Sequence, residues 1–340
     1  MATLRERITA PAHLEPPVPT GGLTFRAATR DDVDGVHAVA VAAAAVDDPR
    51  SRPSTADVER TLSTDGLDVA SDTLVGVDAD GHVQAYAIVI DIPSRVTAAR
   101  AVLEGAVHPG LRGRGIGRRL FAWQVGRARQ RLAGLDVDLP ASIDAGGPEG
   151  ASVLRLAARF GFEPVRTWLD MERVFDERSG TDLPGLPEGL HLRPATDADI
   201  EPLRTAKNDA FRDHWGSQPM VASDWRGFLT SSKSRLDLSR VVVDAGGAVV
   251  AFAIVEVDPA TFDARGRSYG YVHWVGVVRA ARGKGLAPIV LDAACDAVRA
   301  DGLSAAVLHV DAENPSGAGR IYERLGFVPG EAHVTVATSL

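Results

Sequence analysis

The stretch Arg282-Gly283-Lys284-Gly285-Leu286-Ala287 places glycines and cations between an apolar run, residues 272–278, and a pattern typical of a helix. A strand that ends there and a helix that begins there point several backbone N–H groups, with the positive end of the helix dipole, into one small volume. Glycines let the backbone lie close to a ligand, and successive N–H groups can form an anion-binding nest. The stretch therefore predicts a site for a phosphate or pyrophosphate.

The same device occurs earlier in the chain, as Arg112-Gly113-Arg114-Gly115-Ile116-Gly117. The two turns are separated by 170 residues, since 282 − 112 = 170. Arg26 and Arg193 lie in similar strand patterns, and Phe160-Gly161-Phe162 matches Leu325-Gly326-Phe327 at nearly the same spacing. Landmarks that recur in the same order at nearly constant spacing predict a duplicated unit.

These landmarks and the distribution of proline and glycine predict the domain organisation. Residues 1–22, rich in both, are expected to form a flexible N-terminal arm. An N-terminal domain is expected over 23–175, a linker over 176–189 and a C-terminal domain over 190–340. A chain of 340 residues is long enough for two such cores.

The composition excludes several classes of protein. At 45% hydrophobic and 24% charged residues, with a formal net charge of −8, the chain predicts a globular protein without a nucleic-acid or membrane partner. Its single cysteine, Cys295, excludes an intramolecular disulfide and a multi-cysteine metal site. No metal is expected. Cys295 lies in an apolar helical pattern and is expected to be buried. No apolar run is long enough to span a membrane and the first residues lack a signal-peptide core, which favours a cytoplasmic location. A monomer or homodimer is expected.

Each copy shows the same order of expected elements, which predicts an α/β or α+β fold with a mixed sheet. A strand and a helix come first, and turns at residues 78–81 and 244–247 then predict a hairpin. The strand before the glycine-rich turn follows, and then a helix that ends near Gly134 or Gly302. A further strand, a helix and a final strand are expected to complete the second copy.

An arginine, a glycine and a glycine or alanine at this spacing after a strand resemble the GNAT acyl-CoA N-acyltransferases. In copy two the resemblance also includes Asn314, Tyr322 and Leu325-Gly326-Phe327, and the tandem layout is similar to the mycothiol synthases. The resemblance implies two tandem GNAT-like domains, each a mixed, mostly antiparallel twisted sheet flanked by helices. It also implies an N-acetyltransferase that uses acetyl-CoA as cosubstrate.

The resemblance assigns coenzyme contacts to both turns. Backbone N–H groups of the turn would hold the pyrophosphate, cations would add charge, and the preceding strand would offer backbone groups to the pantetheine arm and the thioester carbonyl. In copy two the implied set is Val275, Gly276, Val277, Arg282, Gly283, Lys284, Gly285, Leu286, Ala287, Asn314 and Tyr322. In copy one it is Val107, Arg112, Gly113, Arg114, Gly115, Ile116 and Gly117.

Tyr322 matches the general acid of the family, which protonates the leaving thiolate; the alternative is a helix tyrosine packed beside Leu325.

The family often carries a glutamate base, as mycothiol synthases do, at the position of Tyr271. His273 is the better candidate here, because histidine accepts a proton near neutral pH. Strand alternation puts Tyr271, His273 and Val275 on one face, unless the strand has a bulge. The alternative is a hydrogen-bonded histidine in a buried strand. Reserve candidates for the base are His309, Asp311 and Glu256.

Copy one lacks part of this machinery. Ala157 aligns with Tyr322, and no asparagine occupies the segment that aligns with Asn314. Copy one is therefore expected to be degenerate, either structural or coenzyme-holding. Choice of acceptor is expected to depend on residues 208–215 with Trp225 and Phe228, unless the two tryptophans are simply buried against the sheet.

Two functions follow from this sequence. The first is an N-acetyltransferase whose C-terminal domain acetylates a primary amine of a small molecule. The alternative is a non-catalytic protein that binds CoA or acyl-CoA. A nucleotide-binding site is less well supported, since the spacing of the glycines matches neither Gly-x-Gly-x-x-Gly nor a Gly-Lys-Ser/Thr loop.

Overall fold

The computed structural model describes residues 2–64, 66–92, 95–176, 183–313 and 318–340, and the chain forms two compact units. Unit 1 comprises Met1–Arg166 together with His333–Leu340, and unit 2 comprises Thr167–Ala332. These bounds differ from the domain ranges expected from the sequence. No helix in the described ranges is long and apolar enough to cross a membrane.

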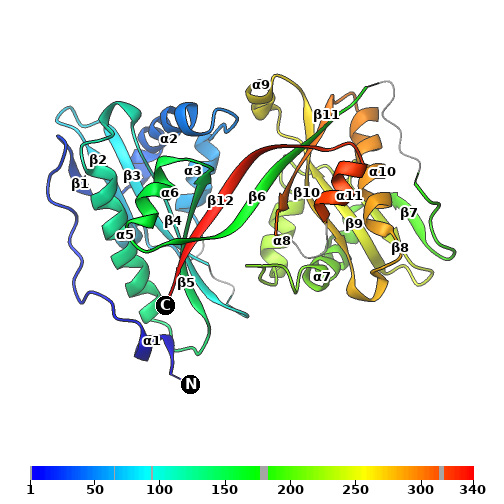
Figure 1. The fold of residues 1–340 in the computed structure, drawn as a ribbon, viewed down its shortest axis with the longest axis horizontal. Coiled ribbons are helices and arrows are strands. Elements are labelled where there is room, and N and C mark those ends of the chain that lie inside the picture. The colour runs from blue at the N-terminus through cyan, green and yellow to red at the C-terminus, as the bar shows by residue number, and fades with distance from the viewer. Residues whose placement is uncertain (1, 65, 93–94, 177–182, 314–317) are drawn as a thin grey trace. The chain divides into compact units, whose positions relative to one another are not determined.

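Unit 1 is a mixed sheet with helices (Figure 1). Its strands lie in the order β1-β2-β3-β4-β5-β12, and only β4 and β5 run parallel. The strands are β1 (Thr24–Arg26), β2 (Thr73–Val77), β3 (Val83–Asp91), β4 (Ala99–Val107), β5 (Ala141–Pro148) and the second half of β12 (Val328–Ser339). The helices are α1 (Leu4–Arg7), α2 (Val33–Asp47), α3 (Thr55–Leu62), α4 (Val69–Asp72), α5 (Ile116–Ala133) and α6 (Ser152–Ala158).

Unit 2 repeats this plan. Its strands lie in the order β6-β11-β10-β9-β8-β7, and only β10 and β11 run parallel, so the expected mixed, mostly antiparallel sheet is confirmed. The strands are β6 (Glu163–Val174), β7 (His191–Pro194), β8 (Arg240–Val243), β9 (Val249–Glu256), β10 (Tyr269–Val277) and β11 (Ala305–Asp311). The helices are α7 (Ile200–Ala210), α8 (Ala222–Leu229), α9 (Phe262–Arg265), α10 (Leu286–Ala300) and α11 (Ala318–Arg324).

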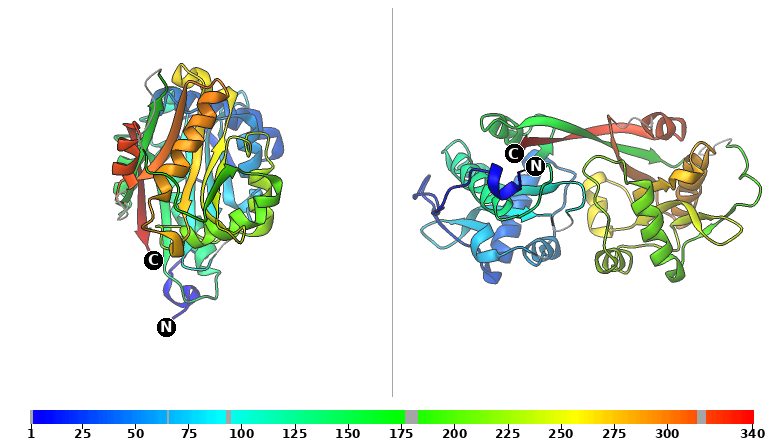
Figure 2. Two further views of the ribbon diagram at one scale, coloured as in Figure 1. Left: turned by 90° about the vertical axis from the view of Figure 1, so that its right-hand side faces the viewer. Right: turned by 90° about the horizontal axis from the view of Figure 1, so that it is seen from below.

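Helices cover both faces of each sheet and divide the core into layers. In unit 2, α10 packs Val290 and Val298 on one face, while Leu203 of α7 and Trp225 of α8 pack on the other. Figure 2 shows α10 and the α7–α8 pair on opposite sides of these strands. Cys295 of α10 is buried, as its sequence pattern predicted.

The first helix of each copy begins with the same hydrogen-bonded cap, which confirms the duplication. Asp32 accepts from the Thr29 backbone (2.8 Å) and from both terminal nitrogens of Arg26 (2.7 Å each). Asp199 makes the same contacts with Thr196 (2.8 Å) and Arg193 (2.7 Å each). In each cap a buried carboxylate lies at the positive, N-terminal end of the helix dipole. The alignment of Arg26 with Arg193 therefore also aligns α2 with α7.

The last strand of each copy pairs within the other copy's unit. Residues 168–174 of β6 pair with β11 in unit 2, and residues 333–339 of β12 pair with β5 in unit 1. The expectation that the final strand completes copy two is therefore wrong. Both strands follow a Gly-Phe pair, and each pairs with an antiparallel partner at the same position in its sheet. The sequence patterns of β6 and β12 therefore do not indicate which of the two, β11 or β5, each strand pairs with.

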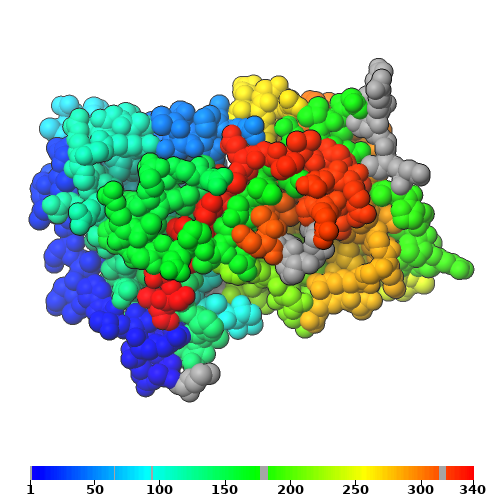
Figure 3. Space-filling view, in the orientation of Figure 1, coloured from blue at the N-terminus to red at the C-terminus, as the bar shows by residue number. Residues whose placement is uncertain are grey.

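The N-terminal residues expected to form a flexible arm pack against unit 1. Leu4 is fully buried, Ile8 is nearly so, and the Leu4 backbone N–H donates to Val137 O (2.8 Å). Arg7 donates from Nη1 to Leu340 O (3.0 Å), and Figure 3 shows the N-terminal segment in blue against the C-terminal residues in red. Two apolar side chains anchor a segment whose proline content suggested only a tail.

Candidate active site

Both glycine-rich turns join a strand to a long helix, as predicted. Helix α5 begins at Ile116 and α10 at Leu286. Their N-caps, Gly115 and Gly285, have φ of 83° and 71°, a left-handed conformation that a Cβ disfavours. The first N–H groups of each helix lack intrahelical partners and face the turn, which is the geometry that binds an anion.

The predicted coenzyme contacts occupy these two strand–turn–helix segments. In unit 2 they are Val275, Gly276 and Val277 on β10, Arg282, Gly283, Lys284 and Gly285 in the turn, and Leu286 and Ala287 at the start of α10. In unit 1 they are Val107 at the end of β4, Arg112, Gly113, Arg114 and Gly115 in the turn, and Ile116 and Gly117 on α5. Asn314 lies outside the described residues.

The parallel strands beside each turn separate along their length. In unit 2 the β10–β11 pairing covers residues 269–271 and 305–307, although β10 continues to Val277 and β11 to Asp311. In unit 1 the β4–β5 pairing covers residues 99–102 and 141–144, although β4 continues to Val107. The strand edge next to each turn is therefore not used by its parallel neighbour, and its backbone groups can bind an extended ligand.

The arginines that open the turns bind protein groups. Arg112 donates from both terminal nitrogens to Asp47 (2.8 and 2.6 Å), and Arg282 donates to Ala210 O (2.8 Å) with Asp213 at 3.6 Å. We expected Arg282 to add charge beside the phosphates, but these contacts fix the turn to the end of α2 or α7. The cations that follow, Arg114 and Lys284, are exposed in the turns.

A bulge in β10 sets the direction of His273. Val272 pairs with Val255 and Trp274 with Ile254, which leaves His273 as an extra residue in the strand. His273 and Trp274 both contact the ring of Phe228 on α8, at centroid distances of 4.8 and 4.6 Å.

The bulge changes which side chains share a face. Val275 packs with the core under α10, so it does not share the face of Tyr271 and His273, as unbroken alternation would require. The β3–β4 pairing of unit 1 is regular and has no counterpart of His273.

His273 forms a hydrogen-bonded pair with a carboxylate. Its Nδ1 lies 2.7 Å from Glu256 Oε2, on the neighbouring strand β9, and its side chain is 34% exposed. An Nδ1–H that donates to Glu256 leaves Nε2 as the free acceptor of a proton. Glu256, expected only as a reserve base, is placed to orient this imidazole and to stabilise its protonated form.

Tyr271, His309 and Asp170 form a second chain of contacts in unit 2. Tyr271 Oη lies 3.2 Å from His309 Nδ1, and His309 Nε2 lies 3.2 Å from Asp170 Oδ1. Arg265 donates to both Asp170 oxygens (2.9 Å each). Burial alone would raise the pKa of Asp170, but the His309 and Arg265 hydrogen bonds hold that pKa well below its usual range. His309 therefore has a fixed orientation beside Tyr271.

Tyr322 lies on α11, and burial raises the pKa of its phenol to about 12. It therefore stays protonated at neutral pH, as a proton donor must. Its ring packs 6.1 Å from that of Phe327, so part of the packing alternative also holds. The aligned Ala157 of unit 1 is fully buried on α6.

The predicted acceptor region of unit 2 contains two kinds of aromatic residue. Trp225 is fully buried and donates from Nε1 to Ile200 O (2.6 Å), which matches the alternative of a packed tryptophan. Trp168 stacks on His214 (5.9 Å) and lies 6.4 Å from Trp215, and all three are half-buried. Trp168 comes from β6, outside the sequence region we expected, and only the strand pairing reveals it.

Unit 1 contains a cavity of about 820 Å³ at its turn. It extends from Arg112 and Ile116 past Glu104 on β4 to the alanines of α2. Sequence analysis missed Glu104, although a carboxylate in the apolar run before the turn was a visible signal. His333 of β12 also lines the cavity and lies 3.2 Å from Asp48.

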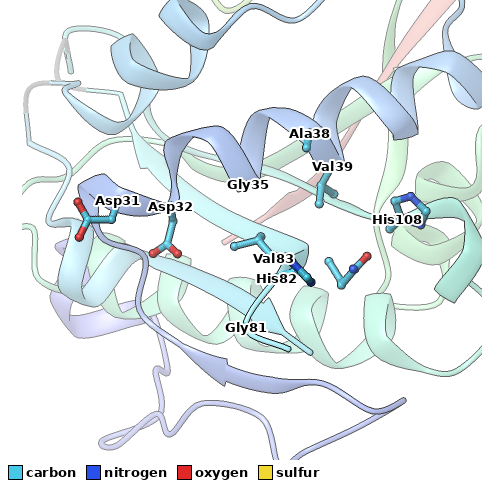
Figure 4. A pocket seen from close by; sticks show the side chains of 10 residues that line it. Asp31, Asp32, Gly35, Ala38, Val39, Gly81, His82, Val83 and His108 are labelled. Atoms are coloured by element: carbon cyan, nitrogen blue, oxygen red, sulfur yellow. The ribbon is translucent and has the colours of Figure 1, made fainter. Parts of the chain in front are cut away.

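A smaller cavity of about 460 Å³ lies along the first half of α2 (Figure 4). Asp31 and Asp32 mark one end of it and His108 the other, and Gly81 and His82 come from the β2–β3 turn. Asp32 is held by Arg26 and caps the helix, so its charge there is already paired.

A family model described as Acetyltransferase (GNAT) family matches residues 200–327. The chain is 34% identical over 281 residues to the mycothiol acetyltransferase of Pseudarthrobacter chlorophenolicus, covering 78% of this chain and 76% of that protein. It is 30% identical over 302 residues to the mycothiol acetyltransferase of Tsukamurella paurometabola, covering 83% and 94%.

Solved structures share the fold over nearly the whole chain. A GCN5-related N-acetyltransferase from Sphaerobacter thermophilus matches with a TM-score of 0.71 and 24% identity, covering 96% of this chain and 97% of that one. A tandem GNAT protein from the clavulanic acid biosynthesis pathway matches with a TM-score of 0.66 and 21% identity, covering 93% and 98%. At these identities the likeness supports the architecture alone.

Proposed function

Since the chain belongs to the GNAT acetyltransferase family, with two copies in tandem, we propose that its C-terminal copy transfers an acetyl group from acetyl-CoA to a primary amine of a small molecule. The observation that carries this assignment is the pair of His273 and Glu256 at 2.7 Å, on a strand bulge that the N-terminal copy lacks. The N-terminal copy is proposed to hold coenzyme A without catalysing transfer, because Ala157 replaces the acid.

The unit 2 turn fits coenzyme A. Free N–H groups at the start of α10 and the exposed Lys284 suit a pyrophosphate, and the open edge of β10 suits the pantetheine arm. Gly276 packs under Phe252, where a Cβ would come within 2.3 Å of the ring, so this part of β10 is held against β9. The coenzyme supplies the thioester whose carbonyl carbon the amine attacks.

Proton transfers are assigned to two side chains. Nε2 of His273 accepts a proton from the ammonium group of the acceptor, and Glu256 stabilises the imidazolium that forms. The neutral amine then forms the amide bond as the C–S bond breaks. The phenol of Tyr322, with its raised pKa, donates a proton to the thiolate, and the attacking nitrogen releases a second proton to solvent as the amide forms, which balances the proton that the phenol then regains. The curated relatives are named for mycothiol, but Tyr271 stands where the resemblance expects their glutamate, so we propose a different small amine.

The test measures acetyl transfer by the full chain to a panel of primary amines, with release of the free CoA thiol as the readout. His273→Gln and Tyr322→Phe are each expected to lower kcat by roughly 10²- to 10⁴-fold, the usual contribution of a general acid or base. Matched controls are His191→Gln on the exposed strand β7 and Tyr269→Phe, whose hydroxyl donates to Thr261 (2.7 Å). Both are expected to keep the wild-type kcat.

The two turns offer a second comparison. Lys284→Ala is expected to weaken the use of acetyl-CoA, whereas Arg114→Ala, at the same position of the unit 1 turn, is expected to keep activity. The opposite result would move catalysis to the N-terminal copy. Acetyl-CoA binding without transfer to any amine would instead favour the alternative of a non-catalytic coenzyme-binding protein.

A further inference from the structure

The N-terminal segment of the chain runs along helix α5. Residues 9–22, which we call the strap, connect the buried α1 to the first strand of the sheet. Near the end of α5, Gln130 donates from its side chain to Pro11 O (2.8 Å). One turn earlier on the helix, Leu14 lies so close to Gly126 that a Cβ there would come within 3.0 Å of it. Figure 1 shows the segment in blue beside α5.

The strap ends against the glycine-rich turn of unit 1. Residues 20–23 form a two-residue turn closed by backbone hydrogen bonds of 3.0 and 3.1 Å, and its central glycines, Gly21 and Gly22, have φ of 65° and 87°. The backbone of Gly21 packs directly on α5, since a Cβ at this position would lie 2.8 Å from Ile116 and 3.3 Å from Arg114. The strap therefore contacts both the glycine-rich turn and the first residue of α5.

Ile116 connects the strap to the unit 1 cavity. Its side chain is 1% exposed, and it lines the cavity beside Gly115 and Gly117, whose backbone belongs to the proposed coenzyme contacts. The same side chain thus contacts the strap and the cavity. Protein interiors are closely packed, so a displacement of the strap at Gly21 is passed on to Ile116 and is not absorbed by empty space.

Unit 2 lacks the glycine that allows this close approach. The offset of 167 that aligns Arg26 with Arg193 also aligns Gly21 with Glu188. Unit 2 keeps the positive φ of the next residue, Gly189 (78°), but Glu188 carries an exposed side chain. The fit between a strap without a Cβ and the start of the helix is therefore a feature of unit 1.

We propose that the strap and a coenzyme at the unit 1 turn stabilise each other. The packed strap holds Ile116 and the turn in the conformation that binds, and the bound coenzyme holds the strap on α5. This inference rests on the proposed coenzyme site of the N-terminal copy and adds its regulation, because displacement of the strap releases the ligand. The coupling is reciprocal, so the factor by which the packed strap raises coenzyme affinity equals the factor by which coenzyme stabilises the packed strap.

The experiment is hydrogen exchange of the full chain, measured by mass spectrometry during a titration with acetyl-CoA. Peptides that cover residues 109–117 and 279–287 report the affinity of each turn separately, and peptides within residues 9–22 report the strap. In the wild type, acetyl-CoA is expected to protect residues 109–117 and to slow exchange in the strap by roughly fivefold or more, the lower end of typical coupling between two sites.

Gly21→Ala and Gly22→Ala form a matched pair. Both place a Cβ at a positive φ in the same turn, but only the first presses on Ile116, because Gly22 has open space for a Cβ. Gly21→Ala is expected to weaken acetyl-CoA binding at residues 109–117 by roughly fivefold or more relative to Gly22→Ala. The affinity at residues 279–287 is the internal control and should be the same in both variants.

Leu14→Ala tests transmission along the strap. Leu14 packs at Gly126, ten residues along α5 from Ile116 and therefore roughly 15 Å away. Loosening the strap there is expected to speed its exchange and to lower affinity at residues 109–117, although the turn itself is unchanged.

The outcomes separate this inference from the function on which it rests. If acetyl-CoA protects residues 109–117 but leaves exchange in the strap unchanged, and Gly21→Ala binds as tightly as Gly22→Ala, the coupling is refuted and the coenzyme site stands. If residues 109–117 gain no protection while residues 279–287 do, the N-terminal copy does not hold coenzyme, and the coupling fails with it. Acetyl transfer by the C-terminal copy is untouched by either result, because it concerns His273 and Tyr322.

Discussion

The buried ion pair between Asp170, in the second half of β6, and Arg265 predicts that the stability of unit 2, and not that of unit 1, depends on this part of β6. Asp170 falls within residues 23–175, the range expected for the N-terminal domain, yet β6 pairs with β11 in unit 2. We predict that Asp170→Asn destabilises unit 2 and leaves unit 1 at its wild-type stability. If the domains followed the repeat boundaries instead, unit 1 would be the one to weaken.

The size of the effect follows from the contacts of Asp170. The side chains of Asp170 and Arg265 are 8% and 11% exposed, and two hydrogen bonds of 2.9 Å join them. Removing one partner of a buried pair costs roughly 3–5 kcal/mol. Asparagine keeps one oxygen that can accept from Arg265, so we take the lower end, about 3 kcal/mol. This corresponds to roughly a hundredfold increase in the opening equilibrium of unit 2.

The single cysteine of the chain provides the assay. Cys295 lies on α10 in unit 2, and burial raises the pKa of its thiol to about 12, so it is protected while unit 2 is folded. When closing is fast relative to labelling, the rate of reaction with a disulfide reagent follows the population of the open form. The labelling rate is expected to rise roughly hundredfold in Asp170→Asn, in line with the free energy worked above.

A matched change in unit 1 completes the test. Asp144 on β5 is buried and accepts from Arg100 Nε (2.6 Å), so Asp144→Asn is expected to lower the stability of unit 1 without accelerating the labelling of Cys295. Rapid labelling in Asp144→Asn together with slow labelling in Asp170→Asn would refute the assignment of the β6 end to unit 2.

Three other predictions follow from the described contacts. The pKa of Asp170 is lower in the folded protein than its ordinary value of 3.8. The stability that the Asp170 carboxylate contributes is therefore present above pH 3.8 and is lost as the pH falls through the folded pKa. In acid titration, the stability of unit 2 should therefore fall less steeply with pH in Asp170→Asn than in wild type. Gly285→Ala forces a Cβ into a conformation with φ of 71°, which should destabilise the turn by about 1–2 kcal/mol and weaken acetyl-CoA binding in calorimetry. Gly227→Ala, within α8 and with open space for a Cβ, should instead raise the midpoint of thermal unfolding, since alanine stabilises a helix by about 0.5–1 kcal/mol relative to glycine; a lower midpoint would contradict this.

Local patterns predicted the parts of the site that depend on local chemistry. The glycine-rich turns, the helices that begin at Ile116 and Leu286, and the hairpin turns all occur where residue type and spacing indicated. Each of these depends on a few neighbouring residues, such as glycines with positive φ or an aspartate that caps a turn. A sequence carries such information within a short window.

The features that the sequence did not predict depend on contacts between distant segments. The bulge at His273 is a mismatch between β10 and β9, and neither strand shows it alone. Arg282 binds the end of α7 because the two segments meet in space, not because of its neighbours in the chain. The partner of β12 was missed for the same reason, since β5 and β11 offer equivalent edges.

The exchanged strands also affect the order in which the protein can fold during synthesis. Strand β5 has its antiparallel partner only once residues 333–339 have been translated, and until then one edge of the first sheet stays open to other chains. The second unit has β6 available from the start, so it can close as soon as β11 emerges from the ribosome. The N-terminal half of this chain is therefore expected to be the last to mature, and a nascent chain stalled before β12 should aggregate through β5.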